Sequence, residues 1–265
     1  MLDYAEGQAV RYTSLDTGNF TFSINKYKSS ATYITNRMKQ DSFYMSRLVS
    51  SFVPKQHRAI AKAMEIDVLA LPNAGQTTAN PNVINTGAHR FIASGTNAVL
   101  VPQDFAKAKF ALQKANVPMT NLVAIVDSSV EYQLSTMTNL TAVAYNPKWE
   151  GIVRDGASTG IKFLFNVYGF DVYTSQNLPN GINESITAYG SAKTISDSSG
   201  VANYFFSAAP DVLPFVGSIR QPPKVDSDYN KDLQREEYVT TCRYGFKLFR
   251  PENIVTVISD ASQIV

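Results

Sequence analysis

A helical pattern of unusual length is the feature of this sequence that most constrains its fold. Apolar side chains recur at spacings of three and four over residues 41–71, which is typical of one face of an α-helix. An unbroken helix of this length would span about 45 Å. Asp41 is a candidate N-cap. Pro54 lies inside the pattern, where we expect it to kink the helix or to start a second one.

One carboxylate lies on the apolar face of this helix. Asp67 follows Ile60, Ala63 and Met64 at helical spacing, so its side chain points toward the buried side. A buried carboxylate needs a partner. We therefore expect Asp67 to be a structural buried carboxylate held by an ion pair or by backbone hydrogen bonds, and we favour this role over a catalytic one.

Alternating segments rich in Thr, Tyr and Ile precede the helix. Residues 20–24 and 31–35 are predicted strands with one solvated face, and residues 15–19 contain the Asp and Gly of a hairpin turn. After the helix, residues 72–98 are rich in Gly, Pro, Asn and Thr. This composition predicts a loop between two lobes.

The next part of the chain alternates between helix and strand. Residues 103–116 predict an amphipathic helix, and residues 122–126 predict a short buried strand. Ser128 and Glu131 match a capping box at the start of another helix. Together with the earlier strands, these elements predict an α+β fold.

The remaining segments predict further strands. Residues 169–174 read as a strand, and residues 244–258 as two strands around the turn at Arg250-Pro-Glu. Residues 182–204 are mostly small and polar, so we expect an excursion or a loop there.

Residues that commonly carry catalysis or bind metals are scarce. Cys242 is the only cysteine, which excludes an intramolecular disulfide and a cysteine-based zinc site, and His57 and His89 are the only histidines. Glycine-rich phosphate-binding motifs and the nucleophile elbow are absent. The pair Asp226-Ser-Asp228 is expected to be a solvated turn. We expect no catalytic residue, no cofactor and no bound metal, and Cys242 as a packed small side chain.

Charge is unevenly distributed along the chain. The net charge of +2 excludes a basic nucleic-acid-binding protein as the default interpretation. Residues 1–62 nevertheless hold nine Lys and Arg against four Asp and Glu. This surplus suits contact with a neighbouring copy of the same chain, with Arg11, Asp16 and Arg37 as candidate assembly contacts. A solvated face with no partner is the equally weighted alternative.

Several motifs, taken in order, point to one family. They are Ile24-Asn-Lys-Tyr-Lys28, Ala59-Ile-Ala-Lys-Ala-Met-Glu-Ile-Asp-Val-Leu69, Leu112-Gln-Lys-Ala-Asn-Val-Pro118, Val123-Ala-Ile-Val-Asp127, Gly169-Phe-Asp-Val-Tyr-Thr-Ser-Gln-Asn-Leu-Pro179 and Tyr244-Gly-Phe-Lys-Leu-Phe-Arg-Pro-Glu252. From about residue 8 onward, this order resembles the major capsid proteins of tailed bacteriophages, which share the Hong Kong 97-type coat fold.

The resemblance implies a domain organisation. Residues 1–24 would be part of the extended E-loop hairpin, and residues 25–98 a peripheral domain with its spine helix at 41–71 and a sheet. Residues 99–212 would form the axial α/β domain, and residues 213–265 would return to the peripheral domain. Asp67 matches an Asp commonly found near the end of the family's spine helix. Family members usually carry an N-terminal arm and an outgoing E-loop strand before the point at which this sequence begins.

The resemblance also implies a function. The chain would be a non-enzymatic coat protein that assembles with itself into hexamers and pentamers of an icosahedral shell around double-stranded DNA. Its location would be the virion capsid, assembled in the host cytoplasm with scaffolding and portal proteins and with decoration proteins as possible partners. Contact with DNA would be non-specific, and no membrane is involved.

Two alternatives remain open at this point. The first is an encapsulin-type compartment, a cellular relative of the same fold that holds an enzyme cargo. The second is a small α/β enzyme that uses carboxylates such as Asp127, Asp171 and Asp67.

Overall fold

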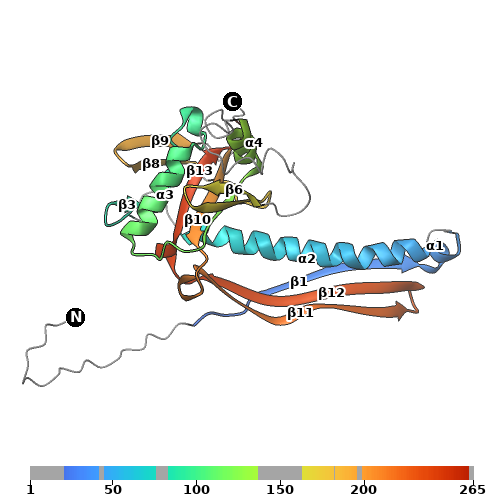
Figure 1. The fold of residues 1–265 in the computed structure, drawn as a ribbon. Helices are drawn as coiled ribbons and strands as arrows, with labels where there is room; N and C mark the ends of the chain where they lie inside the picture. Colours follow the sequence, from blue (N-terminus) through green and yellow to red (C-terminus); the bar gives the residue numbers. More distant parts are fainter. Residues whose placement is uncertain are drawn as a thin grey trace, which may run out of the picture.

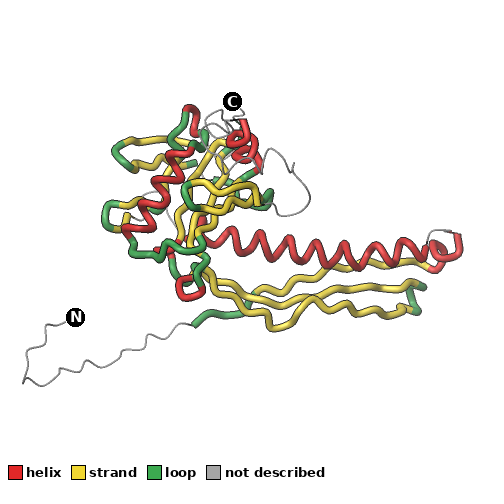
Figure 2. Tube along the Cα trace, viewed as in Figure 1, coloured by secondary structure: helices red, strands yellow, loops and turns green. Residues whose placement is uncertain are grey.

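The computed structural model describes residues 21–41, 45–75, 83–136, 163–181, 183–195 and 199–262. The chain forms a compact part from which a long arm projects (Figure 1). The arm consists of β1 (Lys26–Thr35), α1 (Asn36–Asp41), α2 (Met45–Gly75), β11 (Phe215–Asn230) and β12 (Arg235–Leu248). Helices and strands are segregated in the arm and mixed in the compact part (Figure 2), so the predicted α+β class is confirmed.

The compact part contains the other elements. They are β2 (Val83–Ile84), β3 (Gly87–Ala88), β4 (Arg90–Ile92), η1 (Thr96–Ala98), α3 (Pro102–Lys114), β5 (Leu122–Val126), α4 (Ser128–Thr136), β6 (Phe163–Val167), β7 (Phe170–Thr174), β8 (Glu184–Ala188), β9 (Ser191–Ile195), β10 (Gly200–Ser207), η3 (Pro210–Val212), η4 (Pro251–Asn253) and β13 (Ile254–Asp260).

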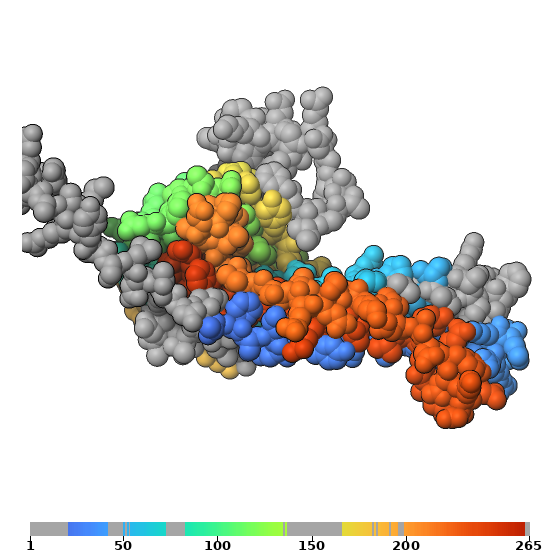
Figure 3. All heavy atoms as spheres, turned by 90° about the horizontal axis from the view of Figure 1, so that it is seen from below, coloured from blue at the N-terminus to red at the C-terminus, as the bar shows by residue number. Residues whose placement is uncertain are grey.

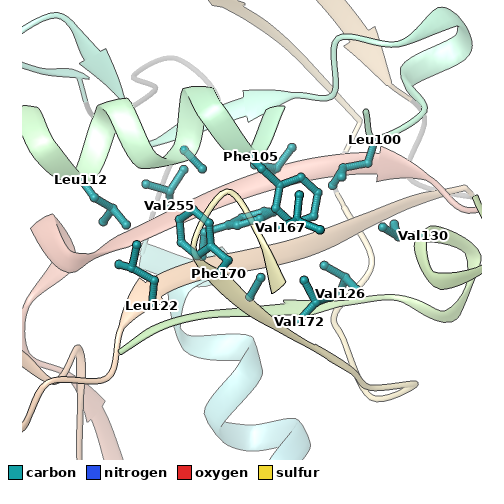
Figure 4. Close-up of a cluster of buried hydrophobic side chains, with 14 of the residues drawn as sticks. Leu100, Phe105, Leu112, Leu122, Val126, Val130, Val167, Phe170, Val172 and Val255 are labelled. Atoms are coloured by element: carbon teal, nitrogen blue, oxygen red, sulfur yellow. The ribbon is translucent and has the colours of Figure 1, made fainter. Parts of the chain in front are cut away.

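A six-stranded mixed sheet organises the compact part. The strand order is β4-β13-β10-β5-β7-β6, in which β13 and β4, and β5 and β7, pair in parallel. Helix α3 lies against one face of the sheet, and the main apolar core fills the space between them (Figure 4). Phe105 meets Phe205 and Phe170 edge-on at centroid distances of 5.0 and 6.3 Å. All three rings are fully buried.

The arm has two layers. Its sheet has the order β1-β12-β11, antiparallel throughout, and α2 packs on one face. Strand periodicity decides which side chains face the helix. Thr240, Cys242 and Tyr244 of β12 are fully buried, and Ile34 of β1 and Ile60 of α2 are no more than 3% exposed. The intervening side chains point away from α2, and no other described element covers them.

The predicted long helix is found, with shifted ends. It runs over Met45–Gly75 in place of residues 41–71, and the expected N-cap Asp41 instead ends the short helix α1. Pro54 lies inside α2, so the prediction of a second helix beginning there is wrong. A proline removes one helical hydrogen bond. Packing on β12 offsets that loss, because Gln56 and Ile60, the second and sixth residues after Pro54, are buried against the sheet.

Several shorter elements match their predictions. The strand at 122–126 is β5, the helix at 103–116 is α3, the strand at 169–174 is β7, and the pair of strands over 244–258 is the end of β12 followed by β13. The strand predicted at 31–35 is the second half of β1. Of the strand predicted at 20–24, the described residues form no regular structure.

Other predictions are wrong. The loop expected within residues 182–204 is one, because the described part contains β8, β9 and the start of β10; β8 and β9 form a two-stranded excursion from the main sheet. Buried Ile186 and Ile195 pack the β8–β9 hairpin against Ile92 and Ile258. Asp226 and Asp228 lie in β11, not in a turn, because pairing with β12 continues through them.

The predicted capping box is replaced by a neighbouring residue. Helix α4 begins at Ser128, and the carboxylate of Asp127 accepts hydrogen bonds from the backbone N–H (2.9 Å) and hydroxyl (2.7 Å) of Ser129. Asp127 therefore accepts the hydrogen bond of a free backbone N–H group at the start of α4. The prediction assigned this capping role to Ser128 and Glu131.

The six-stranded sheet takes strands from three parts of the chain. β4 lies within residues 25–98 and β13 within residues 213–265, yet both pair inside this sheet together with strands from residues 99–212. The loop predicted over residues 72–98 likewise includes the end of α2 and the strands β2, β3 and β4.

Candidate assembly surface

Asp67 joins the helix of the arm to two strands of its sheet. The Tyr244 hydroxyl donates a hydrogen bond of 2.6 Å to Asp67 Oδ2. Lys26 Nζ lies 3.4 Å from Oδ1 and Lys28 Nζ 3.6 Å from Oδ2, and the Asp67 side chain keeps only 17% of its surface exposed. The carboxylate thus binds β12 and β1 to α2 near the base of the arm.

The electrostatics of this cluster favour a charged Asp67. Burial alone would raise the pKa of Asp67, but the Tyr244 hydrogen bond and the charges of Lys26 and Lys28 outweigh burial and lower this pKa. Burial and the Asp67 carboxylate raise the pKa of Tyr244 well above its ordinary value. Asp67 stays ionised and Tyr244 stays protonated, so the hydrogen bond persists over the neutral range.

The cluster follows from strand periodicity. Lys26 and Lys28 alternate along β1 and so share its α2-facing side, and Lys26 lies directly opposite Tyr244 in the ladder. Our sequence interpretation named Asp67 but missed these three partners. The alternation of the two lysines in a predicted strand was the signal that could have found them.

At the far end of the arm, cations are paired with acidic or aromatic groups of the arm itself. Lys39 forms an ion pair with Glu236. Arg235 Nε lies 2.6 Å from Glu237 Oε1, and its guanidinium carbon lies 4.6 Å from the centre of the Tyr33 ring. These contacts fix α1 and the β11–β12 hairpin to the end of β1.

Of the candidate assembly contacts, one lies within the described residues. Arg37 is on α1 at the tip of the arm, with 92% of its side chain exposed and its Nε 3.5 Å from an Asp41 carboxylate oxygen. Arg11 and Asp16 lie outside the described residues. Exposed pairs of this kind contribute little to stability, so the Arg37 side chain can change partner at low cost.

The face of the arm sheet opposite α2, here called the outer sheet face, is open. Its largest apolar groups are Tyr27 and Tyr33 of β1, which are 62% and 59% exposed. In Figure 3, which shows the molecule from below, β1 and β11 lie at the surface along the arm with no other described segment over them.

An apolar groove lies where the arm meets the compact part. Its volume is about 380 Å³. Its lining comes from α2, β5 and β7: Met64, Glu65, Val68, Leu69, Val123, Ile125, Tyr173, Thr174 and Ser175. Glu65 marks its polar rim, accepting hydrogen bonds from Ser175 Oγ (2.5 Å) and Asn177 Nδ2 (2.8 Å). Open apolar surface of this kind is typical of protein–protein contact.

The carboxylates of the enzyme alternative have local structural partners. Asp127 caps α4, and Asp171 accepts a hydrogen bond of 2.9 Å from Asn166 Nδ2. Asp67 belongs to the arm cluster. In the described ranges, no group of three or more His, Cys, Asp or Glu residues could hold a metal ion.

The remaining chemically active side chains are also engaged. The ring nitrogens of buried His89 lie 3.2 and 3.0 Å from the carbonyl oxygens of Gly87 and Glu252, while His57 is exposed on α2. Cys242 is fully buried, donates to the Gln221 carbonyl at 3.2 Å, and burial raises its pKa. A buried thiol with a raised pKa is a poor nucleophile.

Comparison with known proteins decides the family. The sequence matches the family described as phage capsid protein over residues 19–257. The chain belongs to the phage capsid protein family. No curated protein matches the sequence significantly.

Solved phage capsids share the fold of this capsid protein. The mature capsid of bacteriophage PhiM1 matches with a TM-score of 0.64 at 12% identity, covering 97% of this chain and 78% of that one. The cyanophage P-SCSP1u capsid matches at 0.60 and 18%, covering 94% and 80%. A chain of Mycobacterium phage Che8 matches at 0.59 and 17%, covering 88% and 71%.

An encapsulin complex from Synechococcus elongatus PCC 7942 has a related fold, with a TM-score of 0.54 at 8% identity, covering 91% of this chain and 76% of that one. The family match favours the phage protein over the compartment. The protein is therefore a phage major capsid protein with a Hong Kong 97-like fold, as predicted, and has a structural role in the virion capsid. Within the described residues, no helix is long and apolar enough to cross a membrane.

Proposed function

We propose that this capsid protein assembles into hexamers and pentamers of a closed icosahedral shell around double-stranded DNA, and that the arm supplies much of the contact between subunits. The open outer sheet face carries this proposal. A sheet covered on one side only leaves a long surface, with Tyr27 and Tyr33 exposed along one edge strand, and subunits of obligate assemblies bury large surfaces of this kind.

The geometry supports different roles for the arm and the compact part in the capsomer. The arm corresponds to the peripheral domain with α2 as its spine helix, and the compact part corresponds to the axial domain at the centre of each capsomer. Residues 1–24 would belong to the E-loop, with Arg11 and Asp16 contacting a neighbour, and Arg37 would contact a neighbour from the arm tip. Scaffolding, portal and decoration proteins are the further partners, and assembly takes place in the host cytoplasm.

Electron microscopy of the purified full-length protein, with and without its scaffolding partner, tests the proposal. Closed shells or ring-shaped capsomers are expected, and a protein that stays monomeric under every assembly condition contradicts it. Analysis of the particle contents separates the two uses of the fold: nucleic acid inside supports a virion, whereas an enzyme cargo supports a compartment.

A further inference from the structure

Three cations form a stripe on the exposed side of α2. Lys55, Arg58 and Lys62 are spaced by three and four residues, so they lie on one face of the helix. All three are exposed. Gln56 and Ile60, which face the sheet, are 5% and 3% exposed. The three side chains, here called the α2 stripe, therefore point away from the arm sheet.

The charge of this stretch is not balanced locally. From Met45 to Met64 the chain holds four Lys and Arg and no Asp or Glu. The first acidic residue that follows, Glu65, accepts hydrogen bonds from Ser175 and Asn177. Among the described residues, none forms an ion pair or hydrogen bond with the side chains of the α2 stripe.

The other face of the arm behaves differently. There Lys224 Nζ lies 2.7 Å from Asp226, and Arg235 lies 2.6 Å from Glu237. Lys224 and Arg235 on the sheet side are thus paired within the chain, whereas the α2 stripe groups three neighbouring cations that have no such partner among the described residues.

The neighbours of the stripe indicate the chemistry of its partner. Ala59 and Ala61 lie between its cations, so the centre of the stripe lacks the aromatic or large apolar side chains typical of a protein–protein interface. The exposed Ile66 lies one turn beyond its end. The stripe also extends about 10 Å along the helix, and duplex DNA presents about one charge per 1.7 Å of its axis. Small side chains between long cations allow close approach to a phosphate backbone.

We infer that the α2 stripe binds the phosphate backbone of the packaged duplex, so that the α2 side of the arm faces the interior of the shell and the outer sheet face points away from it. This inference rests on the proposed function. Each contact is electrostatic and carries no sequence preference.

Binding of a fluorescent DNA duplex to unassembled full-length subunits, measured from about 50 to 200 mM salt, tests the inference. The test variant is Lys55→Gln, Arg58→Gln and Lys62→Gln together. Its matched control is Lys224→Gln, Lys231→Gln and Arg243→Gln, which removes the same charge from exposed positions on the sheet side and hairpin tip. The test variant should reduce the slope of log affinity against log salt by about 2.7, because each phosphate contact contributes about 0.9.

The control variant should keep the wild-type slope, and Arg58→Lys should keep it as well because the charge is retained. Far-ultraviolet circular dichroism shows whether each variant is folded. An unchanged slope in the folded test variant, or an equal loss in both triple variants, overturns the inference.

Shell formation without DNA, followed by electron microscopy, separates this inference from the proposed function. If the test variant binds DNA normally but fails to form shells, the α2 stripe contacts an acidic surface of another copy and the inference is overturned. If the wild-type protein forms no shells, the proposed function fails regardless of the DNA result.

Discussion

The compact part and the arm bury their side chains in different ways. In the compact part, Leu100, Phe105 and Leu112 are fully enclosed between α3 and the six-stranded sheet. In the arm, a single seam between α2 and the sheet is buried, around Ile60, Cys242 and Tyr244, and the opposite face of the sheet is open. The compact part therefore encloses its core on its own, whereas the arm leaves one face of its sheet uncovered by any other described element.

This difference explains why polar groups are so prominent in the arm. A two-layer seam buries little apolar surface, so it depends on specific pairs such as Asp67 with Tyr244 and Gln56 with Thr240, the latter joined by a 2.8 Å hydrogen bond. Such pairs fix the register of α2 on the sheet and leave the outer sheet face uncovered by the other described elements. The following experiments test this contrast, beginning with the largest expected effect.

Truncation in the compact core should cost the most stability. Phe105→Ala removes a ring that meets Phe170 and Phe205, and should destabilise the unassembled subunit by about 3–5 kcal/mol in urea unfolding. Phe110→Ala on the same helix is the control, because Phe110 is 39% exposed and its loss should cost much less. Similar losses in both variants would contradict the placement of the core.

Truncation in the arm seam should cost less and act locally. Ile60→Ala should destabilise by about 2 kcal/mol, and hydrogen exchange should show lost protection in β1 and β12 but not in β5. Ile66→Ala, at a 43% exposed position of the same helix, should leave exchange unchanged. Equal loss of protection in β5 would show that the arm and the compact part unfold as one unit.

Removing the charge of Asp67 should have a moderate, pH-dependent effect. Asp67→Asn leaves Lys26 and Lys28 without their carboxylate and should cost about 1–2 kcal/mol at neutral pH. The folded-state pKa of Asp67 lies below its ordinary value of 3.8. The difference in free energy of unfolding between wild type and Asp67→Asn should therefore be complete above pH 3.8, and it should vanish as the pH falls through the folded-state pKa.

Urea unfolding of wild type and Asp67→Asn across this acid range measures the effect. Asp171→Asn is the control, since Asp171 has an amide partner and no lysine. A difference between wild type and Asp67→Asn that stays constant down to the lowest pH would refute the role of the carboxylate charge.

Substitution on the outer sheet face should barely change subunit stability but should change assembly. Tyr27→Ser is expected to cost less than about 0.5 kcal/mol, and Tyr33→Ser about 0.5–1 kcal/mol because its ring also contacts the Arg235 guanidinium. Together they should reduce the yield of shells seen by electron microscopy. The pair Tyr27→Phe and Tyr33→Phe keeps both rings and should assemble normally. Normal shells from the serine variant would remove the outer sheet face from the proposed interface.

Charge reversal at the arm tip should have the smallest effect on folding. Arg37→Glu disturbs only an exposed pair with Asp41, so the melting temperature should stay unchanged while assembly is impaired. Unchanged assembly would remove Arg37 from the proposed contacts.

Much of this architecture could be predicted from the sequence, because local periodicity carries it. The spacing of apolar residues over 41–71 predicted a helix that the structure places at Met45–Gly75, and the short aliphatic run at 122–126 predicted β5. The scarcity of Cys and His favoured a structural role over an enzymatic one. The ordered motifs pointed to the capsid family.

The predictions that were wrong depend on contacts between distant residues. The helix continues past Pro54 because β12 packs against it, through contacts such as Thr240 with Gln56, which are 184 residues apart in sequence. The Asp226 and Asp228 segment is a strand because β12 pairs with it. Residues 182–204 form strands because a few buried isoleucines meet the edge of the sheet.

The sequence by itself determined the long helix, the strand-rich α+β class and the carboxylate on the buried helical face, since each follows from the spacing of neighbouring residues. Only the tertiary structure decided that Lys26, Lys28 and Tyr244 surround Asp67, that Lys55, Arg58 and Lys62 stay uncompensated, and that one face of the arm sheet is open. Pairing and exposure depend on which surfaces folding brings into contact, and the spacing of neighbouring residues cannot specify which distant segment will pack against a given side chain.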